Sequence, residues 1–219
     1  RASIWAVELE KTSFSTLARN IILNHLEHRM RAVNLDIRQI AAGGAMLGNT
    51  GGNGCFDIVV SNPPYRRPGQ SWHCRPGKDA ASAPKGSADC LNLAREEIEL
   101  DLNQLLHAAS RLLKPGGKLV LVHQANRLPD VFTALRDWHL EARTLRLVQP
   151  MPGRRPSIFL LSAAKSGKPG GFQIEPPLII ADRPGCLSNE AAAWYGHEPV
   201  MTEIQRLQGL IPVYGEEER

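Results

Sequence analysis

Residues Asn62-Pro63-Pro64-Tyr65 place an amide, two prolines and an aromatic ring directly after an apolar run. The run, residues 56–60, is apolar on both faces, as buried parallel strands are. Neither proline has an N–H to donate, so a sheet cannot continue through them. The Asn62 carboxamide oxygen and the Pro63 carbonyl are then two adjacent acceptors. We expect a clamp for the two hydrogens of an –NH₂ group, with Tyr65 as a flat surface for a planar ring.

Such a clamp has a chemical use. An amino group on an aromatic ring is a weak nucleophile because its lone pair is delocalised into the ring. Two accepted hydrogen bonds favour a more tetrahedral nitrogen, which stabilises the transition state more than the ground state. No strong general base is needed, because the cationic product loses its proton readily. The alternative interpretation is an ordinary turn that contains two prolines.

Two carboxylates precede the clamp at the ends of earlier expected strands. Glu8 ends a strand over residues 4–9 and could accept hydrogen bonds from both hydroxyls of a ribose. Asp36 belongs to a second short strand, over residues 33–40, and could hold the amino group of the same nucleoside's adenine. An exposed carboxylate at a strand end is common, so each residue alone is a weak signal. Their order with Asn62 on successive strands favours a nucleoside site at one edge of a sheet.

Hydrophobic periodicity predicts an alternating α/β order. Further strands are expected at 118–123, 144–148 and 157–163, and helices at 13–27, 91–113 and 128–139, with Ser13 as the first helix's N-cap. The short link at 149–156 favours an antiparallel hairpin at the end. We therefore expect a Rossmann-like, mostly parallel sheet covered by helices, with a terminal antiparallel hairpin. Ligands of such sheets bind beyond the carboxyl ends of the strands.

Two irregular segments interrupt this order. Residues 43–54 are rich in glycine, but no helix follows them, so the geometry is wrong for a phosphate-binding loop. Their role is unexplained. Residues 66–89 are polar and rich in Gly, Pro and Ser, which predicts a long loop of the kind that often carries function.

The charge distribution favours a polyanionic partner. The net charge is +4, but residues 111–155 hold nine Lys/Arg against three Asp/Glu, and residues 187–219 hold two against six. We expect the basic residues near the clamp and after the fourth strand to contact RNA phosphates. These are Arg66, Arg67, Arg127, Arg154 and Arg155. The alternative is a solvated surface with scattered charges.

The composition of the chain argues against a membrane protein and against a metal-binding protein. The chain has 219 residues, 42% hydrophobic and 22% charged, without an apolar run of about 18 residues, so no membrane partner is expected. Cysteines stand at 55, 74, 90 and 186 without a CxxC pair. His73, Cys74 and Cys90 match no usual zinc spacing, so we expect no metal and reduced thiols in a cytoplasmic protein.

Several segments together resemble a known family. Ile4-Trp5-Ala6-Val7-Glu8-Leu9, Leu35-Asp36-Ile37 and Asn62-Pro63-Pro64-Tyr65 are similar to motifs of class I S-adenosylmethionine-dependent amino-methyltransferases. "LLKPGGKLVLVHQANRLPDVFTALR", "LRLVQP" and "IEPPLIIADRPGCLSNEAAAWYG" resemble the bacterial tRNA(Val) adenine-N(6) methyltransferases, which modify the adenine next to the anticodon. The third segment is the most discriminating.

The resemblance implies roles for particular residues. It implies S-adenosylmethionine as cofactor and tRNA as partner. Glu8 and Leu9 would lie at the cofactor's ribose, and Asp36 and Ile37 at its adenine. Asn62, Pro63, Pro64 and Tyr65 would form the catalytic clamp, with Asn62 also close to the cofactor.

The sequence departs from that family before Glu8. The family has a strand and a glycine-rich loop there that touch the methionine part of the cofactor, and residues 1–7 offer neither. We therefore expect a methyltransferase domain over 1–196 that is incomplete at its N-terminus, an acidic tail over 197–219, and a monomer.

Three other functions stay open at this stage. A release-factor glutamine methyltransferase uses the same clamp because a side-chain amide also offers –NH₂. A ribosomal RNA guanine methyltransferase is the third enzyme class, and a non-catalytic RNA-binding remnant is the non-enzyme alternative. His123 and the pair Arg95-Glu96 could lie near the site, although a structural histidine and a solvated ion pair are the simpler interpretations.

Overall fold

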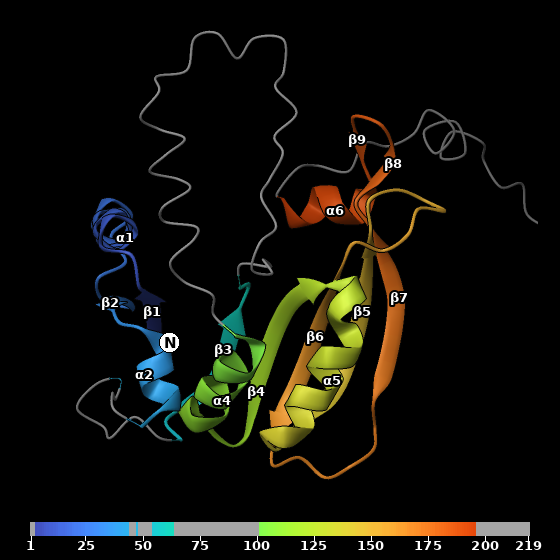
Figure 1. Cartoon of the computed structure of the whole chain (residues 1–219). Coiled ribbons are helices and arrows are strands. Elements are labelled where there is room, and N and C mark those ends of the chain that lie inside the picture. The colour runs from blue at the N-terminus through green and yellow to red at the C-terminus, as the bar shows by residue number, and fades with distance from the viewer. Residues whose placement is uncertain (1–2, 44–46, 48–53, 64–100, 196–219) are drawn as a thin grey trace, which may run out of the picture.

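The computed structural model describes residues 3–43, 47, 54–63 and 101–195, and shows an α/β architecture (Figure 1). The first part of the chain contains β1 (Ile4–Glu8), α1 (Lys11–Leu23), β2 (Met30–Asn34), α2 (Ile37–Ala41) and β3 (Phe56–Ser61). The second part contains α4 (Leu102–Leu112), β4 (Leu113–Gln124), η2 (Ala125–Arg127), α5 (Leu128–Asp137), β5 (Leu140–Gln149), β6 (Ile158–Lys165), β7 (Gln173–Ile179), β8 (Ala181–Arg183), β9 (Cys186–Leu187) and α6 (Asn189–Trp194).

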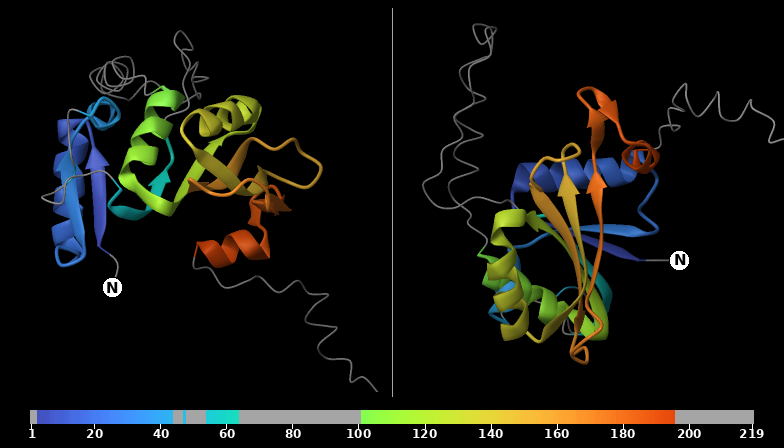
Figure 2. Two further views of the ribbon diagram at one scale, coloured as in Figure 1. Left: turned by 90° about the horizontal axis from the view of Figure 1, so that it is seen from below. Right: turned by 90° about the vertical axis from the view of Figure 1, so that its right-hand side faces the viewer.

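The main sheet has five strands in the order β3-β4-β6-β5-β7. β3 is parallel to β4, and β5 is parallel to β7, whereas β6 runs antiparallel to both β4 and β5. The predicted mostly parallel sheet and its β5–β6 hairpin are thus confirmed. β1 and β2 pair in parallel as a separate sheet, and Figure 2 shows them running across the direction of the main strands.

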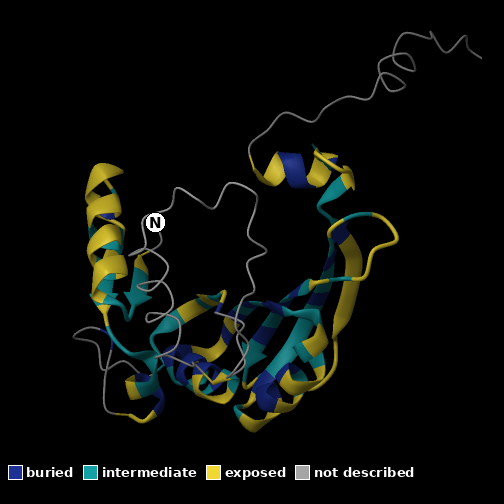
Figure 3. Cartoon of the chain, turned by 45° about the horizontal axis from the view of Figure 1, so that its top comes forward, coloured by how far each residue is buried: buried dark blue, intermediate teal, exposed yellow. Residues whose placement is uncertain are grey.

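Two hydrophobic cores hold these layers together. Helices α4 and α5 cover one face of the main sheet and are amphipathic, with apolar residues recurring at helical spacing. The larger core lies beneath them and includes Leu106, Leu119, Leu121, Val131, Leu135, Phe159 and Leu161. A second core joins α2 and α4 to the β1–β2 sheet through Ile40, Ala41, Leu47, Ala108 and Leu112. Figure 3 shows this burial concentrated where helices meet strands.

The predicted strand over 33–40 is wrong in its second half. β2 ends at Asn34, and Ile37 begins the helix α2. The Asp36 carboxylate caps that helix, because its Oδ1 accepts a hydrogen bond from the Arg38 backbone N–H at 2.9 Å. The helix cap that Asp36 provides therefore stabilises α2 at a position where the apolar pattern predicted a continuing strand.

The first helix begins earlier than predicted, and Ser13 is not its N-cap. Glu10 caps α1 by accepting hydrogen bonds from the backbone N–H groups of Thr12 and Ser13. These bonds favour the charged form and lower the pKa of Glu10 to about 2. Helix α1 also ends at Leu23, short of the expected Glu27.

The stretch Lys114-Pro115-Gly116-Gly117, expected to end a helix, forms the beginning of the long strand β4. Glycine is required at 117 because a Cβ there would lie 2.9 Å from the Lys114 carbonyl oxygen and 3.1 Å from that of Phe56. This close approach lets β3 and β4 pair directly after the α4 helix ends at Leu112. The expected helix residues 91–100 lie outside the described part of the chain.

Strand β7, the β8–β9 hairpin and α6 follow the region in which the sequence patterns predicted elements. β7 contains Pro176 and Pro177 and lies at the edge of the sheet, where a missing N–H donor is tolerated.

Within the described residues, no helix is long and apolar enough to cross a membrane.

Phe159 tests the packing of the main core. Its side chain is fully buried in β6, so Phe159→Ala should lower the free energy of unfolding by about 3–5 kcal/mol. Ile174→Ala on the exposed face of β7 is the control and should change it by less than about 0.5 kcal/mol. Urea denaturation measures both values, and equal effects would contradict this assignment of the core.

Candidate functional site

Asn62 lies at the carboxyl end of β3, at the edge of the main sheet. The parallel register pairs Ser61 with Leu121, so the chain leaves the sheet beside the last residues of β4. Asn62 is exposed, whereas Pro63 is buried. A buried proline fixes the backbone direction, which places the exposed carboxamide next to a rigid carbonyl. Pro64, Tyr65, Arg66 and Arg67 lie outside the described residues.

Glu8 ends β1 with its carboxylate held on one side by backbone amides. Its Oε1 accepts hydrogen bonds from the N–H groups of Leu9 at 3.0 Å and Glu10 at 3.4 Å. A carboxylate has about four lone-pair sites, so this arrangement leaves acceptor capacity for hydroxyl donors. Asn34 ties the end of β2 to this turn, because its Nδ2 donates to the carbonyl oxygens of Glu8 and Leu9. The structure thus braces the predicted ribose-binding turn.

Asp36 follows β2, at the same edge of the small sheet as Glu8. Its carboxylate accepts hydrogen bonds from Arg38 Nε at 3.0 and 2.8 Å and lies 2.6 Å from Arg38 Nη2. The hydrogen bonds from Arg38 hold the pKa of Asp36 below its usual range. Ile37 is partly buried and packs against both cores. A ligand amino group would therefore share Asp36 with Arg38.

The small sheet and the main sheet each contribute part of the predicted site. Glu8 and Asp36 come from neighbouring parallel strands and share one edge. Asn62 ends a strand of the other sheet, and the two sheets are linked through the core around Ile40 and Leu112. The structure thus places the two carboxylates at one edge of the small sheet and the amide at the end of a main-sheet strand.

The arginines predicted to bind RNA gather at the carboxyl edge of β4 and β5. Arg127 belongs to the η2 turn directly after β4 and pairs with Asp130. The Ala125 N–H donates to the Ser157 carbonyl oxygen at 3.0 Å, which joins that turn to the β5–β6 loop. This loop carries Arg154 and Arg155, both exposed.

His123 lies one residue before the end of β4 and is 6% exposed. Its ring packs near Phe159, with 6.2 Å between ring centroids, and its Nδ1 accepts a hydrogen bond from the Gln124 N–H at 2.9 Å. Burial, and then the positive charge of Arg127, lower its pKa below the ordinary histidine value. A neutral ring whose Nδ1 accepts carries its proton on Nε2. Arg95-Glu96 lies outside the described residues.

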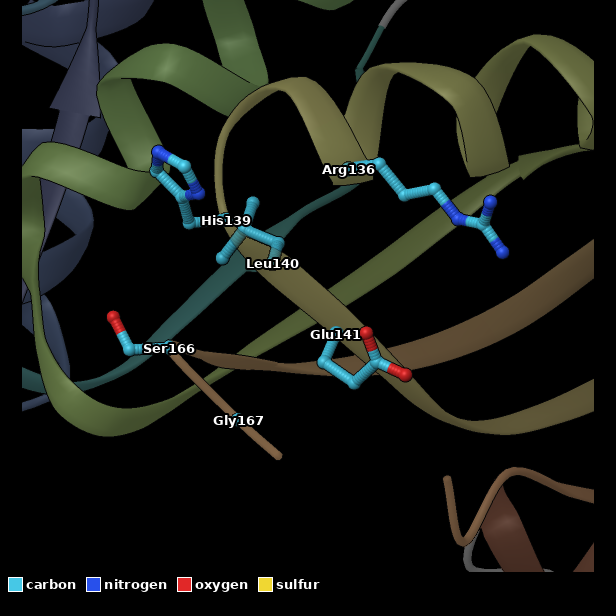
Figure 4. A pocket seen from close by; sticks show the side chains of 6 residues that line it. All are labelled: Arg136, His139, Leu140, Glu141, Ser166 and Gly167. Atoms are coloured by element: carbon cyan, nitrogen blue, oxygen red, sulfur yellow. The ribbon is translucent and has the colours of Figure 1, made fainter. Parts of the chain in front are cut away.

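The carboxyl edge of the main sheet holds no metal cluster among the described residues, and a cavity lies elsewhere. No group of three His, Cys, Asp or Glu side chains is placed to hold a metal among the described residues, and His73, Cys74 and Cys90 lie outside them. A cavity of about 310 Å³ lies at the opposite end of the sheet, at the start of β5 (Figure 4). Its lining consists of Arg136, His139, Leu140, Glu141, Ser166 and Gly167.

Sequence reasoning missed the residues that fix the C-terminal helix. Arg146 on β5 donates from both terminal nitrogens to Glu190 on α6, at 2.6 and 2.8 Å, and from Nε to the Pro176 carbonyl oxygen at 2.9 Å. Its guanidinium also lies 5.7 Å from the Trp194 ring centroid. Residues so far apart in sequence leave no local pattern, so no sequence signal pointed to this cluster.

Comparisons with known proteins point in the same direction as the geometry. A tRNA1(Val) (adenine(37)-N6)-methyltransferase of Tolumonas auensis is 33% identical over 164 residues, 74% of this chain and 57% of that protein. Other curated relatives with the same name include one from Porphyromonas gingivalis, 32% identical over 50% of this chain and 37% of its own length. The chain is a relative of these methyltransferases. No protein-family model matches it.

A glutamine-modifying enzyme and a solved methyltransferase structure are also similar to this chain. A release factor glutamine methyltransferase of Streptomyces coelicolor is 33% identical over 142 residues, 63% of this chain and 44% of that protein. The crystal structure of a predicted O-methyltransferase from Agrobacterium tumefaciens superposes with a TM-score of 0.61 at 15% identity, covering 92% of this chain and 81% of that one. The chain therefore has the Rossmann-like methyltransferase fold, and it spans about half the length of the curated relatives it matches.

The buried His123 predicts a pH-dependent stability. Since the folded-state pKa lies below that of the unfolded chain, stability is full above about pH 6.5 and is lost as the pH falls through the folded pKa. The pKa of His107 is also lowered, mainly because the ring is partly buried. His123→Gln should therefore flatten, without abolishing, the decrease in unfolding free energy as the pH falls below about 6.5. Urea titrations across that range measure it, with His139→Gln as the control, and an unchanged slope in His123→Gln would refute the assignment.

Proposed function

We propose that the chain transfers a methyl group from S-adenosylmethionine to the 6-amino group of an adenine in tRNA, next to the anticodon of tRNA(Val). The observation that carries this proposal is the exposed Asn62 and buried Pro63 at the carboxyl edge of a methyltransferase-like sheet. The adenine-modifying name of several relatives supports the choice of substrate.

The residues at the end of β1 fit the cofactor. Glu8 accepts from two backbone amides through one oxygen and retains capacity for a ribose diol. Leu9 and Ile37 flank the carboxylates, and Asp36 would accept from the adenine amino group beside Arg38. Bound S-adenosylmethionine supplies an electrophilic methyl group on a sulfonium centre.

The clamp acts on the nitrogen that receives the methyl group. Asn62 Oδ1 and the Pro63 carbonyl oxygen would each accept one hydrogen of the substrate amino group. This concentrates the nitrogen lone pair on the side away from the two acceptors, where the N–CH₃ bond would form as the sulfonium S–CH₃ bond breaks and S-adenosylhomocysteine leaves. The proton released from the cationic nitrogen passes to solvent. Pro64 and Tyr65 complete the proposed clamp, with the Tyr65 ring stacked on the adenine.

The basic edge would hold the RNA. Arg127, Arg154 and Arg155 lie around the carboxyl ends of β4 and β5, within the same edge as Asn62, and Arg66 and Arg67 follow the clamp in sequence. Phosphate contacts of this kind position a substrate without selecting its sequence. We further propose that the protein acts as a monomer in the bacterial cytoplasm, where tRNA is modified.

The decisive test supplies labelled S-adenosylmethionine with undermodified tRNA and, in a parallel tube, with a release factor. The assay uses the 219-residue chain. Label in tRNA that digests to N6-methyladenosine supports the proposal. Label in the release factor would instead establish the glutamine enzyme, which the Streptomyces coelicolor relative makes the second candidate. RNA binding without cofactor binding would indicate a non-catalytic remnant.

Asn62→Ala should abolish methyl transfer without weakening the binding of S-adenosylmethionine. Loss of one acceptor aimed at the reacting group should lower kcat by about 100-fold or more, with an unchanged dissociation constant for S-adenosylmethionine. Single-turnover kinetics and calorimetry measure the two effects. Ser61→Ala, one residue earlier, is the control and should retain activity. Near-normal turnover by Asn62→Ala would remove the clamp from the account.

Glu8→Gln should weaken cofactor binding. The amide keeps an oxygen for the Leu9 N–H but removes the charge that strengthens hydrogen bonds to the ribose, so the dissociation constant should rise by about 10-fold or more. Glu10→Gln is the matched control, since Glu10 caps α1 instead. Calorimetric titration with S-adenosylhomocysteine measures both, and equal affinities for Glu8→Gln and the unsubstituted chain would contradict the assigned role.

A further inference from the structure

Helix α6 holds an exposed aromatic pair in a fixed position. Trp194 is 58% exposed and Tyr195, directly after it, is 68% exposed. The helix packs through Ala191 and Ala192, which are both buried. Ser188 Oγ donates to the Ile179 carbonyl oxygen at 2.6 Å and accepts from the Ala191 N–H at 3.1 Å, so Ser188 caps α6 and ties its N-terminus to the end of β7. Large exposed aromatic side chains on an anchored helix often mark a binding surface.

The Trp194 ring lies near a cation that is itself held by three hydrogen bonds. Arg146 donates to both carboxylate oxygens of Glu190 and to the Pro176 carbonyl oxygen, and its guanidinium lies 5.7 Å from the ring centroid. The side chain of Arg146 is 17% exposed. Glu190 neutralises Arg146, so this cluster places the ring without adding net charge. The ring is therefore positioned by polar contacts while much of its surface stays accessible.

The aromatic pair lies at the carboxyl edge of the main sheet. The Ile180 N–H donates to the Gln149 carbonyl oxygen at 2.9 Å, and the Ala181 N–H to that of Pro150 at 3.1 Å. These bonds join the segment that leads into α6 to the loop that carries Arg154 and Arg155. Figures 1 and 2 show α6 beyond the ends of the strands, displaced toward the face that α4 and α5 leave uncovered.

We propose that Trp194, with Tyr195, stacks on an unpaired base of the RNA substrate that neighbours the methylated adenine; this inference rests on the proposed function. The combination of an exposed aromatic surface and nearby exposed arginines is the chemistry that binds single-stranded nucleic acid. The arginines contact phosphates and Trp194 contacts a base face. A tRNA anticodon loop offers both groups within one short unpaired segment.

The test measures RNA binding without cofactor, so that its result does not depend on methyl transfer. The probe is an unmodified anticodon stem-loop RNA with an adenosine after the anticodon. Trp194→Leu keeps an apolar side chain but has no ring face, and should weaken binding by about 5- to 150-fold, the range for one lost base stack. Trp194→Phe should restore most of the affinity. Phe172→Ala removes a partly exposed aromatic at the other end of β7 and should leave binding unchanged.

Salt dependence separates stacking from charge. Trp194→Leu should leave the slope of log K against log salt unchanged, whereas the double variant Arg154→Gln, Arg155→Gln should reduce it. Equal affinity of Trp194→Leu and the unsubstituted chain would overturn the inference, even if tRNA is methylated. Trp194-dependent RNA binding by a chain that methylates no RNA would support the inference and defeat the proposed function. Tight binding of a release factor with no RNA binding would overturn both.

Discussion

The parallel pairing of β3 with β4 is the interaction on which the candidate site depends. It begins with Phe56 beside Leu113, where Gly117 permits close approach to the Phe56 carbonyl, and its last pair is Ser61 with Leu121, two residues before Pro63, which has no N–H to donate. Because the register is set by the buried residues of β4, Asn62 emerges at one defined point of the sheet edge. A shift of one residue would turn the partly buried Val59 and Ser61 and the exposed Val60 of β3 to the opposite faces.

The reversed strand β6 brings the proposed RNA-binding arginines to the same edge. It begins where β4 and β5 end, so the loop before it brings Arg154 and Arg155 to the carboxyl side of the sheet. β7 then runs parallel to β5 and delivers α6 to that side. The clamp, the arginines and the aromatic pair thus belong to different elements. The topology of the main sheet places all of them at its carboxyl edge. The small β1–β2 sheet contributes Glu8 and Asp36 as a separately paired unit.

Local sequence patterns predicted those features of the fold that depend on residues close together in the chain. The alternating elements, the β5–β6 hairpin and the end of β3 at Ser61 follow from hydrophobic periodicity and proline chemistry. The expected burial of β3 on both faces is wrong, because β3 is an edge strand of the described sheet and its Ile58 and Val60 are exposed. The pattern failed at Asp36, where a side chain that caps a helix outweighed apolar residues that suited a strand. It also gave no signal for Arg146, whose contacts with Pro176, Glu190 and Trp194 exist only after β7 has paired with β5.

The most direct test of the account locates the adenine itself on the protein. An anticodon stem-loop RNA with 8-azidoadenosine at the target position would be irradiated in complex with the chain, and the crosslinked peptide sequenced. The account predicts attachment within residues 62–65, where the acceptors of the clamp and the Tyr65 ring meet the base. Attachment at the cavity around Arg136 and Ser166, at the opposite end of the sheet, would contradict it.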